Sequence, residues 1–296
     1  MIKTWISAFR LRTLFLSLAC IMMGYFLASA NGYNNPNAFS FCMLTALFLQ
    51  ILSNLANDYG DSIHGADHDG RKGPKRAVQS GKITKEQMKK AIGMLVVLSL
   101  ISGISLLYFS YDVIGLYGVV SLFTIGIAAI IAAITYTNGK KPYGYAGLGD
   151  ISVFIFFGLV AVCGTYYLQT GLLDIDVVLP ATACGFFSVA VLNINNMRDI
   201  DSDNAAGKKS LPARIGFQNA KYYHLLIILS AFICLIYYSY SHQSEPTNYV
   251  YVIAFVPFVL SLVKIFKTDD KQSLDPLLKV TSLSTFVLVI LFGVFL

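Results

Sequence analysis

The chain has 296 residues, of which 56% are hydrophobic and only 13% carry a charge. Soluble globular domains usually carry about 25% charged residues, so this composition excludes an ordinary water-soluble protein. The net charge of +6 is modest, and we expect no nucleic-acid partner. The sequence therefore predicts a protein that lies mostly within the lipid bilayer.

Nine apolar runs follow one another along the chain, each close to the ~20 residues that a helix needs to cross the hydrocarbon. They cover residues 13–30, 38–56, 91–109, 113–136, 148–168, 177–196, 222–240, 249–266 and 277–296. Helices satisfy their own backbone hydrogen bonds inside lipid. We therefore expect an all-α integral membrane protein, a nine-helix transmembrane bundle in which residues 1–296 form a single domain.

The basic residues predict the orientation of this bundle. All 22 Lys and Arg residues lie near the N-terminus or in the segments 57–90, 137–147, 197–221 and 264–279. The segments that alternate with these contain no Lys or Arg: 31–37, 110–112, 169–176 and 241–248. Cytoplasmic loops are enriched in Lys and Arg, so we expect a cytoplasmic N-terminus and an external C-terminus. Topology and attraction to anionic lipid account for most of these charges.

The second predicted span ends in an acidic motif, Asn57-Asp58-Tyr59-Gly60-Asp61, which is followed by Gly65 and Asp67. Asn57 and Asp61 are four residues apart and therefore project from one side of a helix. Carboxylates at the C-terminal end of a helix are disfavoured by the helix dipole unless a cation accompanies them. The motif therefore predicts a bound cation.

A basic segment with Arg71, Lys72, Lys75 and Arg76 comes next, and residues 84–92 follow it. The pattern Thr84-x-x-Gln87 predicts a capping box at a helix N-terminus. Two interpretations of residues 84–92 stay open, a short amphipathic lid over a site or the ordinary beginning of the third span.

The sixth predicted span ends in a second acidic motif. Asn195, Asp199 and Asp203 repeat the four-residue spacing, whereas Asp201 points away from them. The second and sixth spans run in the same direction, so the two motifs meet at the same membrane face. Mg²⁺ fits such a set because it takes oxygen ligands and is commonly shared between carboxylates and substrate phosphates.

Each acidic motif is followed by basic residues that suit a diphosphate. Arg binds phosphate through two hydrogen bonds, and Lys acts as a point charge. Positioned cations stabilise the negative charge that develops on a departing diphosphate. Of the basic residues after the two motifs, Arg76 and Lys208 are the ones we expect to act in this way.

These motifs resemble those of the UbiA-type intramembrane prenyltransferases. Three stretches narrow the resemblance to the branch of the family that acts in menaquinone synthesis, namely residues 58–81, 142–150 and 192–208. The superfamily has a third acid four residues after Asp61, where this chain has Gly65; Asp67 fits this branch instead. The resemblance implies transfer of a polyprenyl group from an all-trans polyprenyl diphosphate to 1,4-dihydroxy-2-naphthoate, with loss of diphosphate and CO₂. It also implies Mg²⁺ as cofactor and a multi-pass location in the bacterial inner membrane, with the active site facing the cytoplasm.

The resemblance assigns roles residue by residue. It implies that Asp61, Asp199, Arg76 and Lys208 are catalytic. It implies that the metal ligands are Asn57, Asp61, Asp67, Asp199 and Asp203, and that Asn57, Asn195, Arg198 and Gln79 bind substrate. Arg198 could equally form a structural ion pair. We further hypothesise that Tyr143, Tyr145 and Asp150 hold the aromatic substrate, with a turn shaped by Gly and Pro as the alternative for that segment.

Two other functions stay open at this point. A UbiA-type enzyme could use another aromatic acceptor, such as 4-hydroxybenzoate or homogentisate. An ion-coupled transporter is the alternative from another class, because intramembrane acids often mark ion paths. A transporter predicts acids near the middle of spans, whereas these acids gather at two span ends. The length of the prenyl chain and the oligomeric state do not follow from the sequence.

Overall fold

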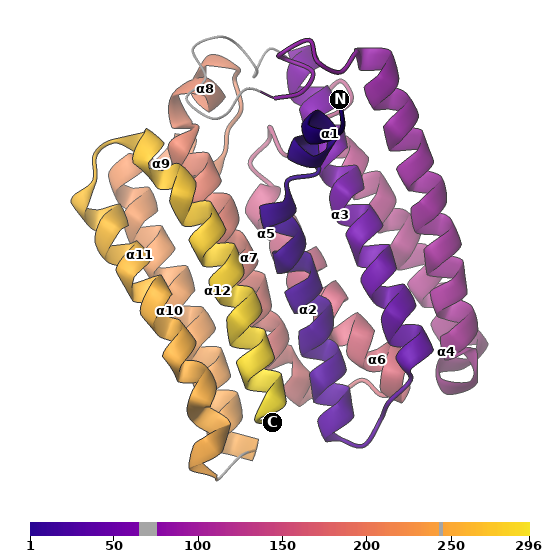
Figure 1. The fold of residues 1–296 in the computed structure, drawn as a ribbon. Helices are drawn as coiled ribbons and strands as arrows, with labels where there is room; N and C mark the ends of the chain where they lie inside the picture. Colours follow the sequence, from indigo (N-terminus) through magenta and orange to yellow (C-terminus); the bar gives the residue numbers. More distant parts are fainter. Residues whose placement is uncertain (65–75, 243–244) are drawn as a thin grey trace.

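The structure is a computed structural model of the chain, and it describes residues 1–64, 76–242 and 245–296. The N-terminal half contains α1 (Ile2–Ala8), α2 (Leu11–Ala30), α3 (Pro36–His64), α4 (Lys85–Thr135), α5 (Gly149–Val153), the π-helical η1 (Phe154–Cys163) and α6 (Gly164–Thr170). The C-terminal half contains η2 (Ile175–Val177), α7 (Val178–Arg198), α8 (Ile200–Ala205), α9 (Leu211–Ile215), α10 (Phe217–His242), η3 (Pro246–Ala254), α11 (Phe255–Lys267), η4 (Lys271–Leu274) and α12 (Asp275–Val294). The elements form an all-helical bundle (Figure 1).

Eight helical segments in the described part of the chain are long and apolar enough to cross a membrane. Seven of them each contain one of the predicted spans, and α4 contains two. The all-α membrane fold is therefore confirmed. The number of crossings stays a prediction, because it depends on how α4 sits in the bilayer.

The 51 residues of α4 would extend about 77 Å as one straight helix, far more than the ~30 Å of hydrocarbon. The helix is interrupted at Gly115, whose φ of 63° and ψ of −177° suit only glycine. The first turns of α4 and the segment that directly follows α4 both reach the end of α3: the Lys89 ammonium lies 5.5 Å from the ring of Tyr59, and the Thr137 hydroxyl donates to the carbonyl of Ala56 at 3.1 Å. Thus α4 turns back on itself at Gly115.

The beginning of α4 answers the question about residues 84–92. Thr84 accepts from the backbone N–H of Gln87 at 3.1 Å, and the Gln87 side chain accepts from the backbone N–H of Thr84 at 2.9 Å. The predicted capping box is confirmed. The helix continues from Lys85 without a break into the apolar part of α4, so these residues are the beginning of the span and form no separate lid.

The helix α7 lies at the centre of the bundle and is the most buried of the eight candidate spans. It packs against α10, η1 and α12, and α3 packs mainly against α4 (Figure 1). The two termini lie at opposite ends of the bundle, and α8 lies at the end that carries the N-terminus (Figure 1). The end of α3 lies at that same end, so the fold brings the segments with the two acidic motifs to one end of the bundle (Figure 1).

Candidate active site

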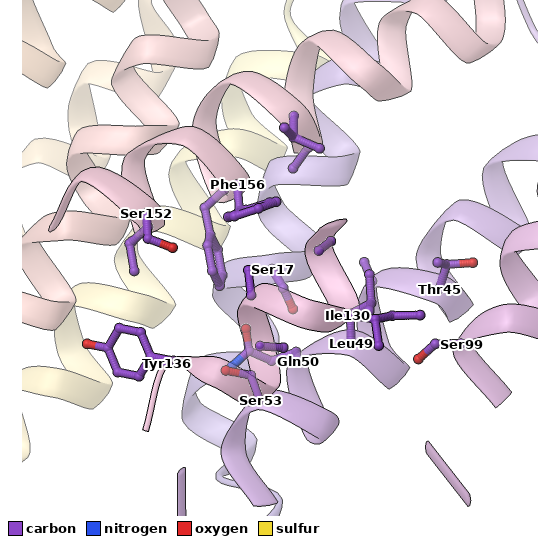
Figure 2. A pocket seen from close by; sticks show the side chains of 18 of the residues that line it. Ser17, Thr45, Leu49, Gln50, Ser53, Ser99, Ile130, Tyr136, Ser152 and Phe156 are labelled. Carbon is purple, nitrogen blue, oxygen red and sulfur yellow. The ribbon is translucent and has the colours of Figure 1, made fainter. Parts of the chain in front are cut away.

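A cavity of about 380 Å³ lies among α2, α3, α4, the α5–η1–α6 segment and α7. Its lining runs along α3 from Cys42 to Asp61, a rise of about 28 Å for 19 residues. Figure 2 shows side chains from α2, α3, α4, α5 and η1 around this space, most of them apolar or hydroxyl-bearing. The cavity is therefore long and mainly apolar, and it reaches both acidic motifs, at Asn57 and Asp61 of the first and at Asn195 of the second.

Six of the predicted site residues line this cavity. They are Asn57, Asp61, Arg76, Tyr143, Asn195 and Lys208. Of the others, Gln79, Tyr145, Asp150, Arg198, Asp199 and Asp203 lie outside the cavity wall, and Asp67 lies outside the described residues. The charged members of the wall all lie near helix ends or between helices, so they gather at one end of a mainly apolar space; they are Arg10, Arg12, Asp61, Arg76 and Lys208.

The first motif occupies the last turns of α3. The buried carboxylate of Asp61 forms an ion pair with Arg76 and accepts a hydrogen bond from the hydroxyl of Tyr145 at 2.8 Å. The guanidinium of Arg76 also donates to the carbonyl oxygen of Asn57 at 3.3 Å. Arg76 therefore contacts both Asn57 and Asp61, the two residues predicted to project from one side of this helix.

The close approach of α3 to Thr137 fixes the position of Asn57. The Thr137 hydroxyl donates to the Asn57 Oδ1 atom at 3.2 Å. A Cβ atom on Gly60 would lie 2.5 Å from the Thr137 Oγ1 atom and 2.6 Å from its carbonyl oxygen, closer than real Cβ atoms come. Glycine at this position therefore allows the amide of Asn57 to reach the segment after α4.

Asp58 and Gln79 both accept hydrogen bonds from the backbone of the segment that carries Arg76. Asp58 is buried, and its carboxylate accepts from the backbone N–H groups of Ala77 at 3.1 Å and Val78 at 3.4 Å. The side chain of Gln79 accepts from the backbone N–H of Arg76 at 3.2 Å. Gln79 was predicted to bind substrate, but this contact holds the turn around Arg76. Sequence reasoning did not assign a role to Asp58, although its place inside the motif was a signal.

The second motif lies where α7 ends and α8 begins. Asp199 separates the two helices, with φ −97° and ψ 10°. Backbone hydrogen bonds of 3.1 Å from Asp199 to Asn195 and 2.8 Å from Asp203 to Asp199 continue across the break. The predicted four-residue spacing is therefore kept although the helix itself is not continuous.

Arg198 is almost wholly buried and binds the second motif directly. Its Nε and Nη2 atoms donate to the two carboxylate oxygens of Asp199 at 2.9 and 2.8 Å, and Nη2 also donates to Asn195 Oδ1 at 2.8 Å. Its Nη1 atom forms an ion pair with Asp275 of α12. Asp275 pairs in turn with Arg12 of α2 at 3.2 Å. Sequence reasoning missed Asp275, which comes 76 residues after Asp199.

Asp203 and Lys208 form the third acid–base pair of the site. The Lys208 ammonium lies 3.3 Å from the carboxylate of Asp203, which also accepts from the hydroxyl of Ser210 at 2.8 Å. Burial alone would lower the pKa of Lys208, but the carboxylates of Asp203 and Asp61 raise it above its usual value. Burial raises the pKa of Asp203, and Lys208 and Ser210 oppose this. Lys208 is therefore a permanent cation that interacts with both acidic motifs.

Tyr145 connects the two motifs physically. Its hydroxyl donates to Asp61, and the Lys208 ammonium lies 5.9 Å from the centre of its ring. The backbone N–H of Lys209 donates to its carbonyl oxygen at 2.9 Å. Burial and the charge of Asp61 raise the pKa of Tyr145, so its hydroxyl keeps its proton and remains a donor. The segment 137–148 thus lies between the ends of α3 and α8.

The other two residues predicted to hold an aromatic substrate differ in their placement. Tyr143 lines the cavity, and its hydroxyl donates to the carbonyl of Ala132 and contacts the hydroxyl of Ser152, both at 3.0 Å. Asp150 instead accepts a hydrogen bond from Tyr223 of α10 at 2.8 Å and lies outside the cavity wall. Of this pair, only Tyr143 is placed where a molecule in the cavity could touch it.

The donor set of the site fits Mg²⁺. Within the described ranges, no three His, Cys, Asp or Glu side chains gather into a metal-binding group of their own. The oxygen-bearing side chains are instead divided between two helix ends, and each described acid among them is accompanied by a basic residue. A divalent ion there would take few ligands from the chain and the rest from phosphate and water, which is the usual environment of Mg²⁺.

The chain is similar to known proteins over nearly its whole length. The model of the UbiA prenyltransferase family matches residues 17–293. The 1,4-dihydroxy-2-naphthoate octaprenyltransferase of Haemophilus influenzae is 41% identical over 99% of this chain and 95% of its own length. The protein of the same name from Escherichia coli is 40% identical over 99% of this chain and 96% of its own length.

The fold has solved relatives as well. A UbiA homologue from Archaeoglobus fulgidus, solved with DMAPP and Mg²⁺ bound, superimposes with a TM-score of 0.60 over 98% of this chain and 99% of its own. The two sequences are 15% identical, so the likeness concerns the fold alone. The family match covers most of the chain, and the relatives align over nearly its full length. The chain therefore belongs to the UbiA prenyltransferase family.

Proposed function

We propose that the chain transfers a polyprenyl group from an all-trans polyprenyl diphosphate to 1,4-dihydroxy-2-naphthoate. Diphosphate and CO₂ are released, and the product is the demethylmenaquinol of menaquinone biosynthesis. The observation that carries the proposal is a long apolar cavity whose polar end contains Asp61, Arg76 and Lys208. The two relatives at about 40% identity, both named as 1,4-dihydroxy-2-naphthoate octaprenyltransferases, support this choice of acceptor. We also propose that residues 1–296 act as one domain, since the cavity wall extends from Arg10 to Leu278.

The cavity suits a substrate with an apolar tail and an anionic head. The tail would lie among the apolar side chains between α2, α3 and α4, away from water. The head would lie at the end with Asp61 and Lys208. Breaking the allylic carbon–oxygen bond leaves a carbocation on the prenyl group and negative charge on diphosphate. Arg76 and Lys208 line the cavity there, and as fixed cations they would stabilise the diphosphate as that charge develops.

Mg²⁺ would be held by Asn57, Asp61, Asp199 and Asp203, and Asn195 would bind the substrate beside it. When bound, Mg²⁺ would neutralise part of the charge on the diphosphate and favour its departure. Tyr145 would keep Asp61 oriented through the 2.8 Å hydrogen bond, and Ser210 would do the same for Asp203. Asp67 belongs to the proposed set on the strength of the family resemblance alone.

The acceptor reacts through a ring carbon. A new carbon–carbon bond forms between this carbon and the prenyl cation, and this carbon loses its proton. The carboxylate leaves as CO₂, and the ring carbon that carried it takes up a proton in its place. The mainly apolar wall of the cavity would keep water from the cation, which water would otherwise capture. Tyr143 would contact the aromatic ring from the wall of the cavity, with its hydroxyl held by Ala132 and Ser152.

An acceptor-exchange assay tests the function. Purified protein in detergent is given a polyprenyl diphosphate, Mg²⁺, and either 1,4-dihydroxy-2-naphthoate, 4-hydroxybenzoate or homogentisate. We expect release of diphosphate with the naphthoate, one CO₂ for each diphosphate, and a product without the carboxylate. Transfer to 4-hydroxybenzoate in preference to the naphthoate would contradict the proposal, and so would a prenylated product that keeps the carboxylate.

We further propose that the end with the two motifs faces the cytoplasm in the inner membrane of a bacterial cell. The basic segments that follow both motifs support this orientation. Because the termini lie at opposite ends of the bundle (Figure 1), we expect a green fluorescent protein fused before Met1 to fluoresce. Alkaline phosphatase fused after Leu296 should be active, because it reaches the periplasm. An inactive phosphatase together with fluorescence from a C-terminal fusion would contradict this orientation.

A further inference from the structure

Four charged side chains form a continuous ionic chain across three helices at the polar end of the bundle. Arg12 lies in the first turn of α2, Arg198 ends α7 and is followed by Asp199, and Asp275 begins α12. Asp275 accepts from Arg12 at 3.2 and 3.4 Å and pairs with Arg198, which binds both oxygens of Asp199. Asp275 is therefore shared by two arginines, one on the cavity wall and one bound to the second motif.

The contacts of Arg198 show why this sharing matters. Its side chain is only 1% exposed, so water contributes little to neutralising its charge. If Asp199 were its sole anionic partner, a divalent ion would have to displace or share that contact, and a buried positive charge would be left beside the metal. Losing one partner of a buried ion pair is strongly unfavourable. Asp275 provides a second carboxylate for the same guanidinium.

We propose that Asp275 is a positioning residue that makes Asp199 available to a divalent cation. It binds the Nη1 side of Arg198 and offsets its charge, while Nε and Nη2 face Asp199. Arg12 holds Asp275 from the other side and, since it lines the cavity, joins this ionic chain to the substrate space. This inference rests on the proposed function, because it concerns the metal of that same site.

A purely structural role for Asp275 makes a different prediction. An acid in the first turn of a helix stabilises it by interacting with the helix dipole. Loss of that interaction would lower the stability of α12 without changing cation binding at the second motif. Measuring cation binding separately from stability therefore distinguishes the two roles.

The test measures binding of Mn²⁺ alone to the purified full-length chain in detergent, by electron paramagnetic resonance, with thermal unfolding as a second readout. We expect Asp275→Asn to weaken Mn²⁺ binding by about 10- to 100-fold, the usual effect of removing a partner that orients a metal ligand. Asp275→Glu keeps the charge and should restore most of the affinity. Asp201→Asn is the matched control, because Asp201 lies two residues from Asp199 but is half exposed and pairs with Lys271 at 2.6 Å.

Unchanged Mn²⁺ affinity in Asp275→Asn overturns the inference, whatever happens to its thermal stability. An equal loss in Asp201→Asn overturns it too, because the effect would then reflect net charge. If Asp275→Asn does not fold, Arg12→Gln provides the test: Asp275 is then left to Arg198 alone, and Mn²⁺ should bind more tightly. Weaker or equal binding in Arg12→Gln contradicts the inference.

The failure of the inference is distinguishable from failure of the proposed function. If the wild-type chain transfers prenyl groups in a Mg²⁺-dependent manner while Asp275→Asn binds Mn²⁺ normally, only the role of Asp275 is wrong. If the wild-type chain binds no Mn²⁺, either alone or together with a non-hydrolysable prenyl diphosphate, the metal site of the proposed function is wrong, and the role of Asp275 with it.

Discussion

Replacement of Asp61 by asparagine is expected to lower the rate of prenyl transfer by at least about 10²- to 10³-fold, the range found when one preorganised electrostatic contact is removed from an active site. Asparagine keeps the shape of the side chain but removes the charge that pairs with Arg76 and acts on Lys208. Arg76 would lose its ion pair with Asp61, Lys208 would keep only the carboxylate of Asp203 of the two that act on it, and a proposed metal ligand would be lost. Diphosphate release at saturating substrate and Mg²⁺ measures the effect.

The neighbouring acid provides the control for this variant. Asp58 is as buried as Asp61, but it accepts from the backbone N–H groups of Ala77 and Val78 and lies outside the cavity wall. Asp58→Asn keeps one oxygen, which can accept the shorter of these two bonds, so we expect its activity to fall far less. Near-native turnover in Asp61→Asn would refute the role of Asp61, and so would equal losses in the two variants.

Replacement of Asp199 by asparagine should have the second-largest effect, a loss of roughly 10²-fold or more in turnover. The amide of asparagine cannot accept both donors of Arg198 with the strength of a carboxylate, and it is a poor ligand for a divalent cation. Part of the loss should be recovered at high Mg²⁺, because binding of the cation is weakened along with catalysis. The measurement is turnover as a function of Mg²⁺ concentration.

Asp201→Asn is again the comparison for this variant, since Asp201 lies in the same motif but pairs with Lys271 on a half-exposed surface. We expect its Mg²⁺ dependence to match that of the wild type. An Asp199→Asn enzyme with native turnover and native Mg²⁺ dependence would show that the second motif has no part in the reaction.

Much of the fold could be predicted from the sequence, because a chain that crosses lipid must satisfy its backbone hydrogen bonds within its own helices. The apolar runs placed every long helix, and the Thr84–Gln87 capping box located the beginning of α4. The turn within α4 lies at Gly115, slightly beyond the predicted gap at 110–112. Hydropathy could not locate it, because Gly115 lies between apolar residues and only its left-handed backbone marks the turn.

The motifs also predicted which segments would meet, because spans of the same direction end at the same membrane face. The contacts between them did not follow from spacing. Tyr145 reaches Asp61 across 84 residues, and Asp275 reaches Arg198 across 77. Such contacts depend on how helices pack, and no local pattern in the sequence encodes them. The functional roles of the site residues stay predictions until the variants are measured.

The placement of Asp150 illustrates the same point. It was grouped with Tyr143 and Tyr145 because all three lie in one short segment. In the structure Tyr145 turns towards Asp61, Tyr143 towards the cavity, and Asp150 towards Tyr223 of α10. Neighbours in a turn point in different directions, so proximity in the sequence could not say which of them would face a substrate.

Anomalous diffraction from crystals grown with Mn²⁺ and a non-hydrolysable prenyl diphosphate is the most direct test of the account. We expect Mn²⁺ between the ends of α3 and α7–α8, with ligands from Asp61 on one side and Asp199 or Asp203 on the other, and the diphosphate beside Arg76 and Lys208. Mn²⁺ bound by one motif alone, or a diphosphate outside the polar end of the cavity, would contradict it.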